Sequence, residues 1–278
     1  MKTAVFSGSD TNYFDNLKKL VLTFNETKCN ENSDLYIFSV GLTIDQINFL
    51  KEQNANILEP NWDIKIKFQA PEWKKLLVIR PFLKNYVNNY DNFIWLDADI
   101  VIQDNRFIKD FNQVSKLGKL SIIPETDQEY LFYKTKNNNL KKVFLNYFKP
   151  TGWVYKNNKK YFGSKFANSI LDKPLFNAGV YSLPKNSKIW ELWSEEYSRI
   201  IKNSNDDYCL NMDQASLNKV IYENSDLVHI FDKKYNWICK NLKPIKSKSK
   251  NYFVTPNIPN EKIILLHLTG NDLINFND

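Results

Sequence analysis

The sequence predicts an α/β fold: a mixed, mostly parallel sheet flanked by helices, in a single domain. Strand-like and helix-like patterns alternate through the first half of the chain, which is typical of a parallel sheet covered by helices. A length of 278 residues with 43% apolar residues is enough for a full hydrophobic core. Only 7 Gly and 10 Pro are present, which argues against low complexity and for a globular protein.

The elements are expected in a regular order along the chain. Short apolar runs predict strands at residues 3–7, 35–40, 56–58 and 93–96. Apolar residues at helical spacing predict three intervening helices: residues 14–25 with Leu17, Leu20, Val21 and Phe24 on one face, a helix beginning at Thr43, and a long helix over residues 72–90. The Thr43 hydroxyl is suited to cap its helix, because Ile44, Ile47 and Leu50 follow at helical spacing.

Targeting and membrane signals are missing from the sequence. Only Ala4, Val5 and Phe6 form an apolar run near the start, and no later run approaches the roughly 18 residues of a membrane span. Cys29, Cys209 and Cys239 are odd in number and form no CxxC pair, so they suggest neither a disulfide framework nor a thiolate zinc site. We therefore expect no transmembrane segment and a reducing, cytoplasmic location.

The formal charge of +7 is concentrated in one part of the chain. Residues 131–171 contain nine lysines and no Asp or Glu, interleaved with ten aromatic residues, so they account for all of the net positive charge. A second cluster at residues 240–250 adds five lysines. Lysines can bind phosphates while aromatic rings stack on sugars or bases, although a solvated Lys-rich surface would have the same composition.

Two carboxylates follow the strand predicted at residues 93–96. Asp97 and Asp99 are one residue apart, and alternation along a continued strand would point both side chains the same way. Ligands of open α/β sheets bind at the carboxyl ends of strands. Two carboxylates so close require a cation, and Mg²⁺ or Mn²⁺ is commonly held by carboxylates with phosphate oxygens completing its shell. The alternative is a solvated acidic turn.

Further motifs follow in an order that is typical of one enzyme family. Together with the Asp97-Ala98-Asp99 motif, they resemble GT-A nucleotide-sugar transferases over nearly the whole chain, and are most similar to the retaining glycosyltransferases of family 8. The motifs are SGSDTNY at residues 7–13, Arg80 at 17 positions before Asp97, FNAGVYSL at residues 176–183, MDQASLN at residues 212–218 and HLTG at residues 267–270.

The resemblance implies roles for particular residues. The metal ligands would be Asp97, Asp99 and His267, holding Mn²⁺ or Mg²⁺, with the nitrogen ligand favouring Mn²⁺ over Ca²⁺. Gln214 would lie beneath the anomeric carbon, with Asp213 and Asn177 as the other catalytic residues. The nucleotide sugar, UDP-glucose or UDP-galactose by resemblance, would contact Ser7, Asp10, Asn12, Tyr13, Arg80, Asp97, Ala98, Ala178, Gly179 and Gly270. A Gln is a poor nucleophile, which favours front-face attack over a covalent intermediate.

The sequence departs from the family after HLTG. The Lys-Pro-Trp that helps to hold the diphosphate in relatives is replaced by NDLINFND, and no lysine follows Lys262. If a cationic side chain holds the diphosphate, the lysines of residues 240–250 are the expected source.

The chain would consist of two halves of one domain. Residues 1–130 would bind the nucleotide sugar, and residues 131–278 would bind the acceptor and complete the catalytic site. Relatives build the acceptor site in the region of residues 131–171, which suggests Lys156, Lys159, Lys160 and Trp153 as acceptor residues. The acceptor could be a glycan, a lipid-linked saccharide or a hydroxymethylated base in DNA.

Two other classes of protein also fit parts of the sequence. DADIV matches the DxDx[TV] motif of haloacid dehalogenase-type phosphatases, in which the first Asp is phosphorylated. That motif normally lies near the start of a domain, and the only later DD pair, Asp206 and Asp207, lies in a polar stretch. A non-enzymatic nucleic-acid-binding module would explain the lysines but leaves His267 and the DQ segment unexplained.

Overall fold

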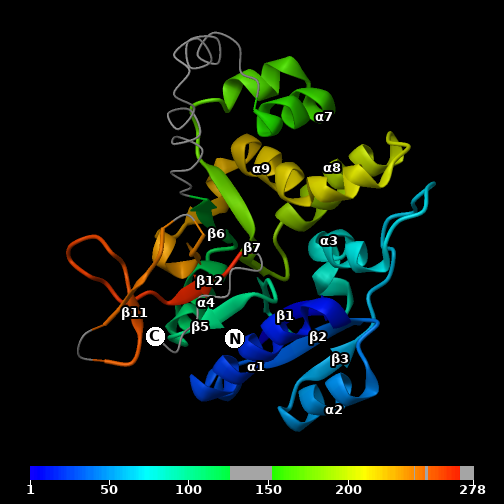
Figure 1. Cartoon of the computed structure of the whole chain (residues 1–278). Coiled ribbons are helices and arrows are strands. Elements are labelled where there is room, and N and C mark those ends of the chain that lie inside the picture. Colours follow the sequence, from blue (N-terminus) through cyan, green and yellow to red (C-terminus); the bar gives the residue numbers. More distant parts are fainter. Residues whose placement is uncertain (126–151, 241, 248–249, 270–278) are drawn as a thin grey trace, which may run out of the picture.

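The computed structural model describes residues 1–125, 152–240, 242–247 and 250–269 (Figure 1). Within these residues, seven strands form the central sheet in the order β3-β2-β1-β4-β7-β6-β8. Their bounds are β1 Thr3–Asp10, β2 Asp34–Val40, β3 Asn56–Leu58, β4 Asn92–Leu96, β6 Leu120–Glu125, β7 Leu175–Pro184 and β8 Val228–Ile230. Strands β3, β2, β1 and β4 are mutually parallel, whereas β7 is antiparallel to both β4 and β6. The sheet is therefore mixed, as predicted.

Helices cover both faces of this sheet. They are α1 Phe14–Glu26, α2 Ile44–Glu52, α3 Lys75–Val78, α4 Arg106–Ser115, α7 Trp153–Ser169, α8 Ile189–Lys202 and α9 Asp213–Glu223. Alternate residues of β4 belong to different core clusters: Ile94 and Leu96 pack with α1 and α4, while Phe93 and Trp95 pack with α8 and α9. Figure 1 shows α7 beyond α8 and α9, at the top of the view. In the described residues, no helix is long and apolar enough to cross a membrane.

Two smaller sheets extend the structure near the C-terminal part of the chain. β5 Ile100–Ile102, β12 Leu265–His267 and β9 Trp237–Ile238 form a three-stranded sheet with β12 in the middle. β10 Ile245–Lys246 pairs with β11 Phe253–Val254. In this sheet β5 begins just after Asp99 and β12 ends at His267, so it brings two of the predicted metal ligands to neighbouring strands.

Most of the predicted elements are confirmed. The four predicted strands correspond to β1, β2, β3 and β4, and the predicted helix over residues 14–25 corresponds to α1, whose predicted apolar face is buried. Thr43 caps α2 in a capping box with Gln46, in which each side chain bonds to the backbone N–H of the other residue. Ile44, however, is 76% exposed, so it does not belong to the buried face of α2.

The long helix expected over residues 72–90 is wrong. This segment consists of the 3₁₀ helix Glu72–Lys74, α3 and a second 3₁₀ helix, Arg80–Asn85. Pro81 explains the break, because its ring lacks an N–H and would clash with the carbonyl four residues earlier in a continuous α-helix. As a result Arg80 lies at the start of a tight turn, 8% exposed, and is directed toward the carboxyl end of β4.

Candidate active site

A tight turn between β4 and β5 carries both predicted metal-binding carboxylates. The Asp97 N–H donates to Gly179 O at 2.8 Å, which extends the β4–β7 pairing by one residue. The Ile100 N–H then donates to Asp97 O at 3.0 Å and closes the turn. The expectation that strand alternation brings Asp97 and Asp99 together is therefore wrong: the chain leaves the strand at Leu96, and the turn brings the two side chains together.

His267 reaches the same point from the C-terminal part of the chain. β12 lies antiparallel to β5 with His267 opposite Ile100, and the Leu268 N–H donates to Asp99 O at 3.0 Å. One ligand atom from each of Asp97, Asp99 and His267 lies within 4.8 Å of the other two. The three predicted ligands therefore lie close together in the structure, although Asp97 and His267 are 170 positions apart in the sequence.

Each of the three ligands has one atom held by the protein and another directed at its neighbours. Asp97 Oδ1 accepts from Arg80 Nη2 at 2.5 Å and from Trp95 Nε1 at 2.7 Å. Asp99 Oδ2 accepts from the Tyr13 hydroxyl at 3.0 Å, and His267 Nδ1 lies 2.8 Å from an Asn236 oxygen. The remaining atoms, Asp97 Oδ2 and Asp99 Oδ1, lie 4.0 and 3.3 Å from His267 Nε2.

This geometry fits a divalent cation. Two ligands that are each about 2.1 Å from an octahedral ion are roughly 3 Å apart at right angles and roughly 4 Å apart on opposite sides. The separations of 3.3 and 4.0 Å found here lie within this range. Two carboxylate oxygens and one imidazole nitrogen form a donor set that suits Mn²⁺ and leaves positions for phosphate oxygens. A divalent metal site is therefore consistent with both the distances and the donor atoms.

Asp99 and His267 each shift the pKa of the other. Burial alone would raise the pKa of the Asp99 carboxyl, but the facing His267 and the hydrogen bond from Tyr13 outweigh burial and lower it. Burial alone would lower the pKa of His267, yet Asp99, with contributions from Asp97 and Glu125, raises it. The two groups therefore shift each other's pKa in opposite directions, each toward its charged form.

Gly179 gives the site its space. A Cβ at this position would lie 2.5 Å from Asp97 Oδ2, 2.7 Å from His267 Cε1 and 2.8 Å from Asn177 Oδ1. The glycine of the NAG motif on β7 is therefore required by the close approach of the metal-binding side chains, which pass directly over its backbone.

Arg80 links the metal-binding turn to helix α9. Its Nη1 donates to Asp213 Oδ2 at 2.5 Å while its Nη2 donates to Asp97, and its Nε has no partner among the described residues. Burial raises the pKa of Asp213, and Arg80 acts in the opposite direction. The guanidinium also lies 5.2 Å from the centre of the Trp95 ring. Both terminal nitrogens of Arg80 thus donate to protein carboxylates.

Gln214 lies in the first turn of α9 with both amide atoms engaged. Its Oε1 accepts from the Ala178 N–H at 3.0 Å, and its Nε2 donates to Glu125 Oε2 at 3.0 Å. Asn218 holds this helix against β7 by donating to Phe176 O and accepting from the Phe176 N–H, both at 2.8 Å. The DQ segment and the NAG strand are therefore neighbours, as their resemblance implies, and the amide of Gln214 has a fixed orientation.

The predicted nucleoside loop follows the carboxyl end of β1. Asp10 caps the short helix Thr11–Tyr13 by accepting from the Tyr13 N–H at 2.9 Å, and Asn12 is exposed. Tyr13 connects this loop to the metal-binding turn through Asp99. Ser7 lies deeper in β1, fully buried, with no partner for its hydroxyl among the described residues. Ala98 and Ala178 are also buried, and Gly270 lies outside the described residues.

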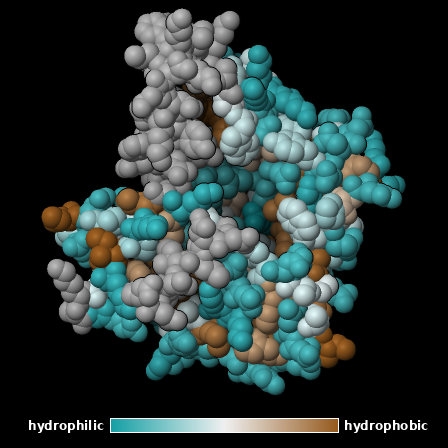
Figure 2. All heavy atoms as spheres, in the orientation of Figure 1, coloured by the Kyte–Doolittle hydropathy of each residue, from teal (hydrophilic) through white to brown (hydrophobic). Residues whose placement is uncertain are grey.

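All three predicted acceptor lysines are exposed on α7, as is Trp153 at its start. The lysines are Lys156, Lys159 and Lys160. Asn157 Nδ2 donates to the Tyr208 hydroxyl at 2.9 Å, which connects α7 to the 3₁₀ helix Asp207–Met212 that leads into α9. Residues 131–151 of the basic segment lie outside the described residues. Figure 2 shows a hydrophilic hollow near the centre of this face, between the regions of α7–α9 and α1–α3.

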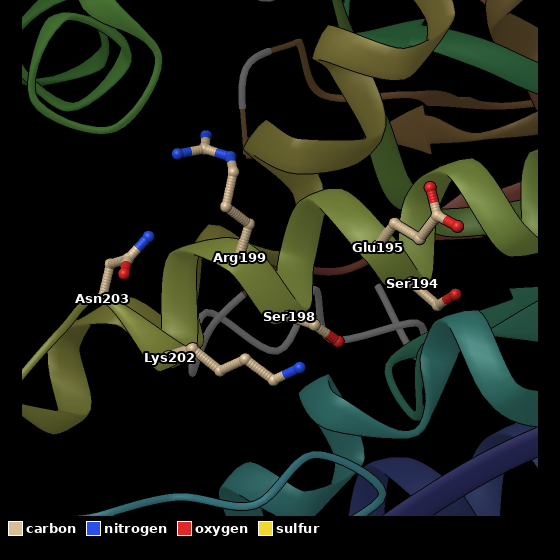
Figure 3. A pocket seen from close by; sticks show the side chains of 6 residues that line it. All are labelled: Ser194, Glu195, Ser198, Arg199, Lys202 and Asn203. Carbon is tan, nitrogen blue, oxygen red and sulfur yellow. The ribbon is translucent and has the colours of Figure 1, made fainter.

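A separate surface pocket lies along α8 (Figure 3). The residues that line it have polar or charged side chains, and Arg199 and Lys202 point to opposite sides of the helix. The lining residues are Ser194, Glu195, Ser198, Arg199, Lys202 and Asn203. None of the metal ligands lines this pocket, so it is distinct from the metal site.

Sequence reasoning missed three residues that hold this site. Glu125 is the last residue of β6, Trp95 lies inside β4, and Asn236 directly precedes β9. None of these three residues belongs to a recognisable motif. Their contacts to Gln214, Asp97 and His267 depend on pairing between distant strands. Only the folded chain brings these partners together.

Comparison with known proteins identifies the fold. No protein-family model and no curated protein matches the chain. Among solved structures, it is similar to galactosyltransferase LgtC in complex with donor and acceptor sugar analogues, at 14% identity and a TM-score of 0.54, over 96% of this chain and 87% of that chain. It is also similar to apo mouse xyloside xylosyltransferase 1, at 10% identity and a TM-score of 0.58, over 98% of each chain.

A third similar structure is the bifunctional glycosyltransferase WbbM, at 14% identity and a TM-score of 0.58, over 97% of this chain and 46% of that chain. The chain therefore has the GT-A fold, the fold of nucleotide-sugar glycosyltransferases, and this prediction is confirmed. Membership of family 8 stays a prediction.

Proposed function

We propose that this protein is a metal-dependent glycosyltransferase that moves a hexose from a UDP-sugar to an acceptor hydroxyl with retention of configuration. The observation that carries the proposal is the convergence of Asp97 Oδ2, Asp99 Oδ1 and His267 Nε2 at the carboxyl end of β4 in a GT-A fold. Mn²⁺ is the favoured ion, with Mg²⁺ as the alternative. When bound there, the ion neutralises charge on the diphosphate leaving group.

The chain's own residues would position the donor. Asp10, Asn12 and Tyr13 belong to the loop that Tyr13 connects to Asp99, and this neighbourhood supports their proposed role in binding the nucleoside. The lysine cluster of residues 240–250 begins just after Cys239. The N–H of Cys239 donates to His267 O at 2.9 Å, so the start of the cluster lies next to the end of β12. This neighbourhood supports the cluster as a source of positive charge for the diphosphate. UDP-glucose and UDP-galactose are the favoured donors.

Retention is supported by the place of Gln214. Its amide is neutral, is fixed by Ala178 and Glu125, and its oxygen keeps a second lone pair that could stabilise positive charge at the anomeric carbon. A neutral amide is a poor nucleophile, so front-face attack fits this site better than a covalent intermediate. An α-linked donor should therefore give an α-linked product, which NMR of the anomeric proton would detect.

A panel of UDP-, GDP- and CMP-sugars with Mn²⁺, scored for nucleotide release without acceptor, tests the activity. We expect slow hydrolysis of a UDP-hexose that is lost in excess EDTA, in Asp99→Asn and in His267→Ala. Asp15→Asn removes an exposed carboxylate from the first turn of α1 and serves as the matched control, with unchanged activity. Full activity in EDTA would contradict the metal assignment.

The acceptor is proposed to be a glycan or a lipid-linked saccharide. The exposed lysines and Trp153 of α7 support a phosphate-bearing acceptor, because lysines pair with phosphates and aromatic rings stack on sugars. Hydroxymethylated DNA is the alternative acceptor with the same chemistry. Salt-sensitive binding to DNA without hydrolysis of any nucleotide sugar would instead favour a non-enzymatic binding protein.

A further inference from the structure

A line of hydrogen bonds connects the metal histidine to strand β7. His267 Nδ1 lies 2.8 Å from Asn236 Oδ1, and Asn236 Nδ2 donates to Asn177 Oδ1 at 3.0 Å. The same Asn177 oxygen accepts from the Gly179 N–H at 2.8 Å. Asn236 is 2% exposed and His267 is 4% exposed, so bulk water does not compete for these bonds.

The backbone N–H of Gly179, at the β7 end of this line, determines the direction of every hydrogen bond in it. The Gly179 N–H can only donate, so the Asn177 atom that faces it is the amide oxygen. Asn236 must then present its NH₂ group to that oxygen and its own carbonyl oxygen to His267. Because a carbonyl oxygen only accepts, Nδ1 of His267 carries a proton and is not available as a metal ligand.

We infer that Asn236, oriented by Asn177, is a positioning residue that fixes the tautomer and the ring plane of His267 so that Nε2 faces the cation. The inference rests on the proposed metal-dependent function and concerns the same site. Asn236 contacts Nδ1 of the imidazole, whereas Asp97 and Asp99 face Nε2, so Asn236 acts on the metal-binding nitrogen through the ring of His267. Backbone pairing supports this arrangement, because β9, which begins at Trp237, runs parallel to β12 with Ile238 opposite His267.

The tautomer matters because the site contains a competing partner for the imidazole. Asp99 Oδ1 is 3.3 Å from His267 Nε2, so a neutral ring protonated at Nε2 could donate to Asp99 and occupy the position of the cation. In that tautomer the lone pair of Nδ1 would face the oxygen of Asn236 at 2.8 Å, which is repulsive. Among the two tautomers of the neutral ring, Asn236 therefore disfavours the one that closes the site and favours the one whose Nε2 lone pair can bind metal.

Mn²⁺ binding, measured by electron paramagnetic resonance without any nucleotide, tests the inference directly. Loss of a partner that orients a metal ligand typically weakens metal affinity by roughly 10–100-fold, and we expect this loss for Asn236→Ala. Asn236→Asp keeps an acceptor for Nδ1–H but loses the NH₂ group that donates to Asn177, so it should recover part of the affinity. The matched control is Asn92→Ala, which removes a buried Asn that accepts from Ser115 and Ser182 at 2.7 Å, at the opposite end of β4.

The pattern of results separates the two proposals. Wild-type protein that binds no Mn²⁺ would overturn the metal site and the role of Asn236 together. If the wild-type protein binds Mn²⁺ and the affinity of Asn236→Ala is within twofold of the wild-type affinity, only the role of Asn236 would be overturned. Equal weakening by Asn236→Ala, Asn236→Asp and Asn92→Ala would also overturn it, because the effect would then reflect stability and not the orientation of the imidazole.

A second measurement needs no variant that could fail to fold. The chain has only two histidines, and His229 is exposed, so a protein labelled with ¹⁵N-histidine gives two imidazole systems. In wild-type protein loaded with diamagnetic Cd²⁺ in place of Mn²⁺, we expect a protonated Nδ1 and a cadmium-coupled Nε2 for His267. Coupling at Nδ1 would overturn the inference.

Discussion

Replacing Gly179 with Ala is the most direct perturbation of the proposed metal site. The backbone of Gly179 lies outside the left-handed region, so an Ala residue is conformationally acceptable and only its methyl group matters. That methyl carbon would lie 2.5 Å from Asp97 Oδ2, whereas ordinary contact begins at 3.4 Å. Asp97 must therefore move by about 1 Å, several times the roughly 0.2 Å within which metal–ligand distances are held.

The expected effect is large on function and modest on stability. A displacement of about 1 Å at a reacting site can cost on the order of 10²-fold in rate, and we expect at least this loss in UDP-hexose hydrolysis together with weaker Mn²⁺ binding. Overpacking by one methyl group should lower the free energy of unfolding by about 1–3 kcal/mol, measured by urea denaturation. The chain should therefore stay folded while losing its metal affinity.

Gly152→Ala is the matched control for this experiment. Gly152 also has a negative φ, of −59°, and a Cβ there would meet no atom of the described residues within 4 Å. It should leave Mn²⁺ binding and hydrolysis unchanged. If Gly179→Ala bound Mn²⁺ as tightly as wild type, the three side chains would not be arranged around a cation as argued above.

Three further substitutions test other parts of the site. Replacing Arg80 with Leu leaves Asp97 and Asp213 without their buried cation and should cost about 3–5 kcal/mol of unfolding free energy in urea; a change under 1 kcal/mol would contradict this. Glu125→Ala should lower hydrolysis by freeing the Gln214 amide, whereas Glu125→Gln keeps an acceptor and should retain more activity; equal activities would remove Glu125 from this role. Changing the exposed lysines Lys156, Lys159 and Lys160 together to Gln should raise the acceptor KM, most strongly at low salt, and leave donor hydrolysis unchanged. Loss of hydrolysis would instead assign these lysines to binding of the diphosphate.

Local sequence signals were sufficient for much of the first half of the fold. The apolar spacing of α1 and the capping box at Thr43 act within one or two turns, so they are visible in a short window of sequence. The break at Pro81 was also a local signal, and the helical pattern on either side of it concealed its effect. Strand order could not be predicted in this way, because the insertion of β7 between β4 and β6 depends on pairing over long sequence separations.

The sequence predicts the proposed metal ligands of the candidate site but not the contacts that hold them. Asp97, Asp99 and His267 were indicated by residue type and motif order, and they do converge. The reason given for the two carboxylates, alternation along a strand, was wrong, since a turn places them. Asn236 carries no motif, and its role follows only from the hydrogen bonds that link β7, β9 and β12.

Arg80 explains how the donor and catalytic parts of such a site can act as one unit. Its two terminal nitrogens bind a metal-ligand carboxylate on one side and Asp213, next to Gln214, on the other. Asp97 Oδ1 is occupied by Arg80 and Trp95, so only Oδ2 remains for the cation. Any movement of α9 would therefore act through one buried guanidinium on the orientation of Asp97. Because a planar guanidinium bonds to two carboxylates in fixed directions, a Lys at this position would supply the charge without this geometric coupling.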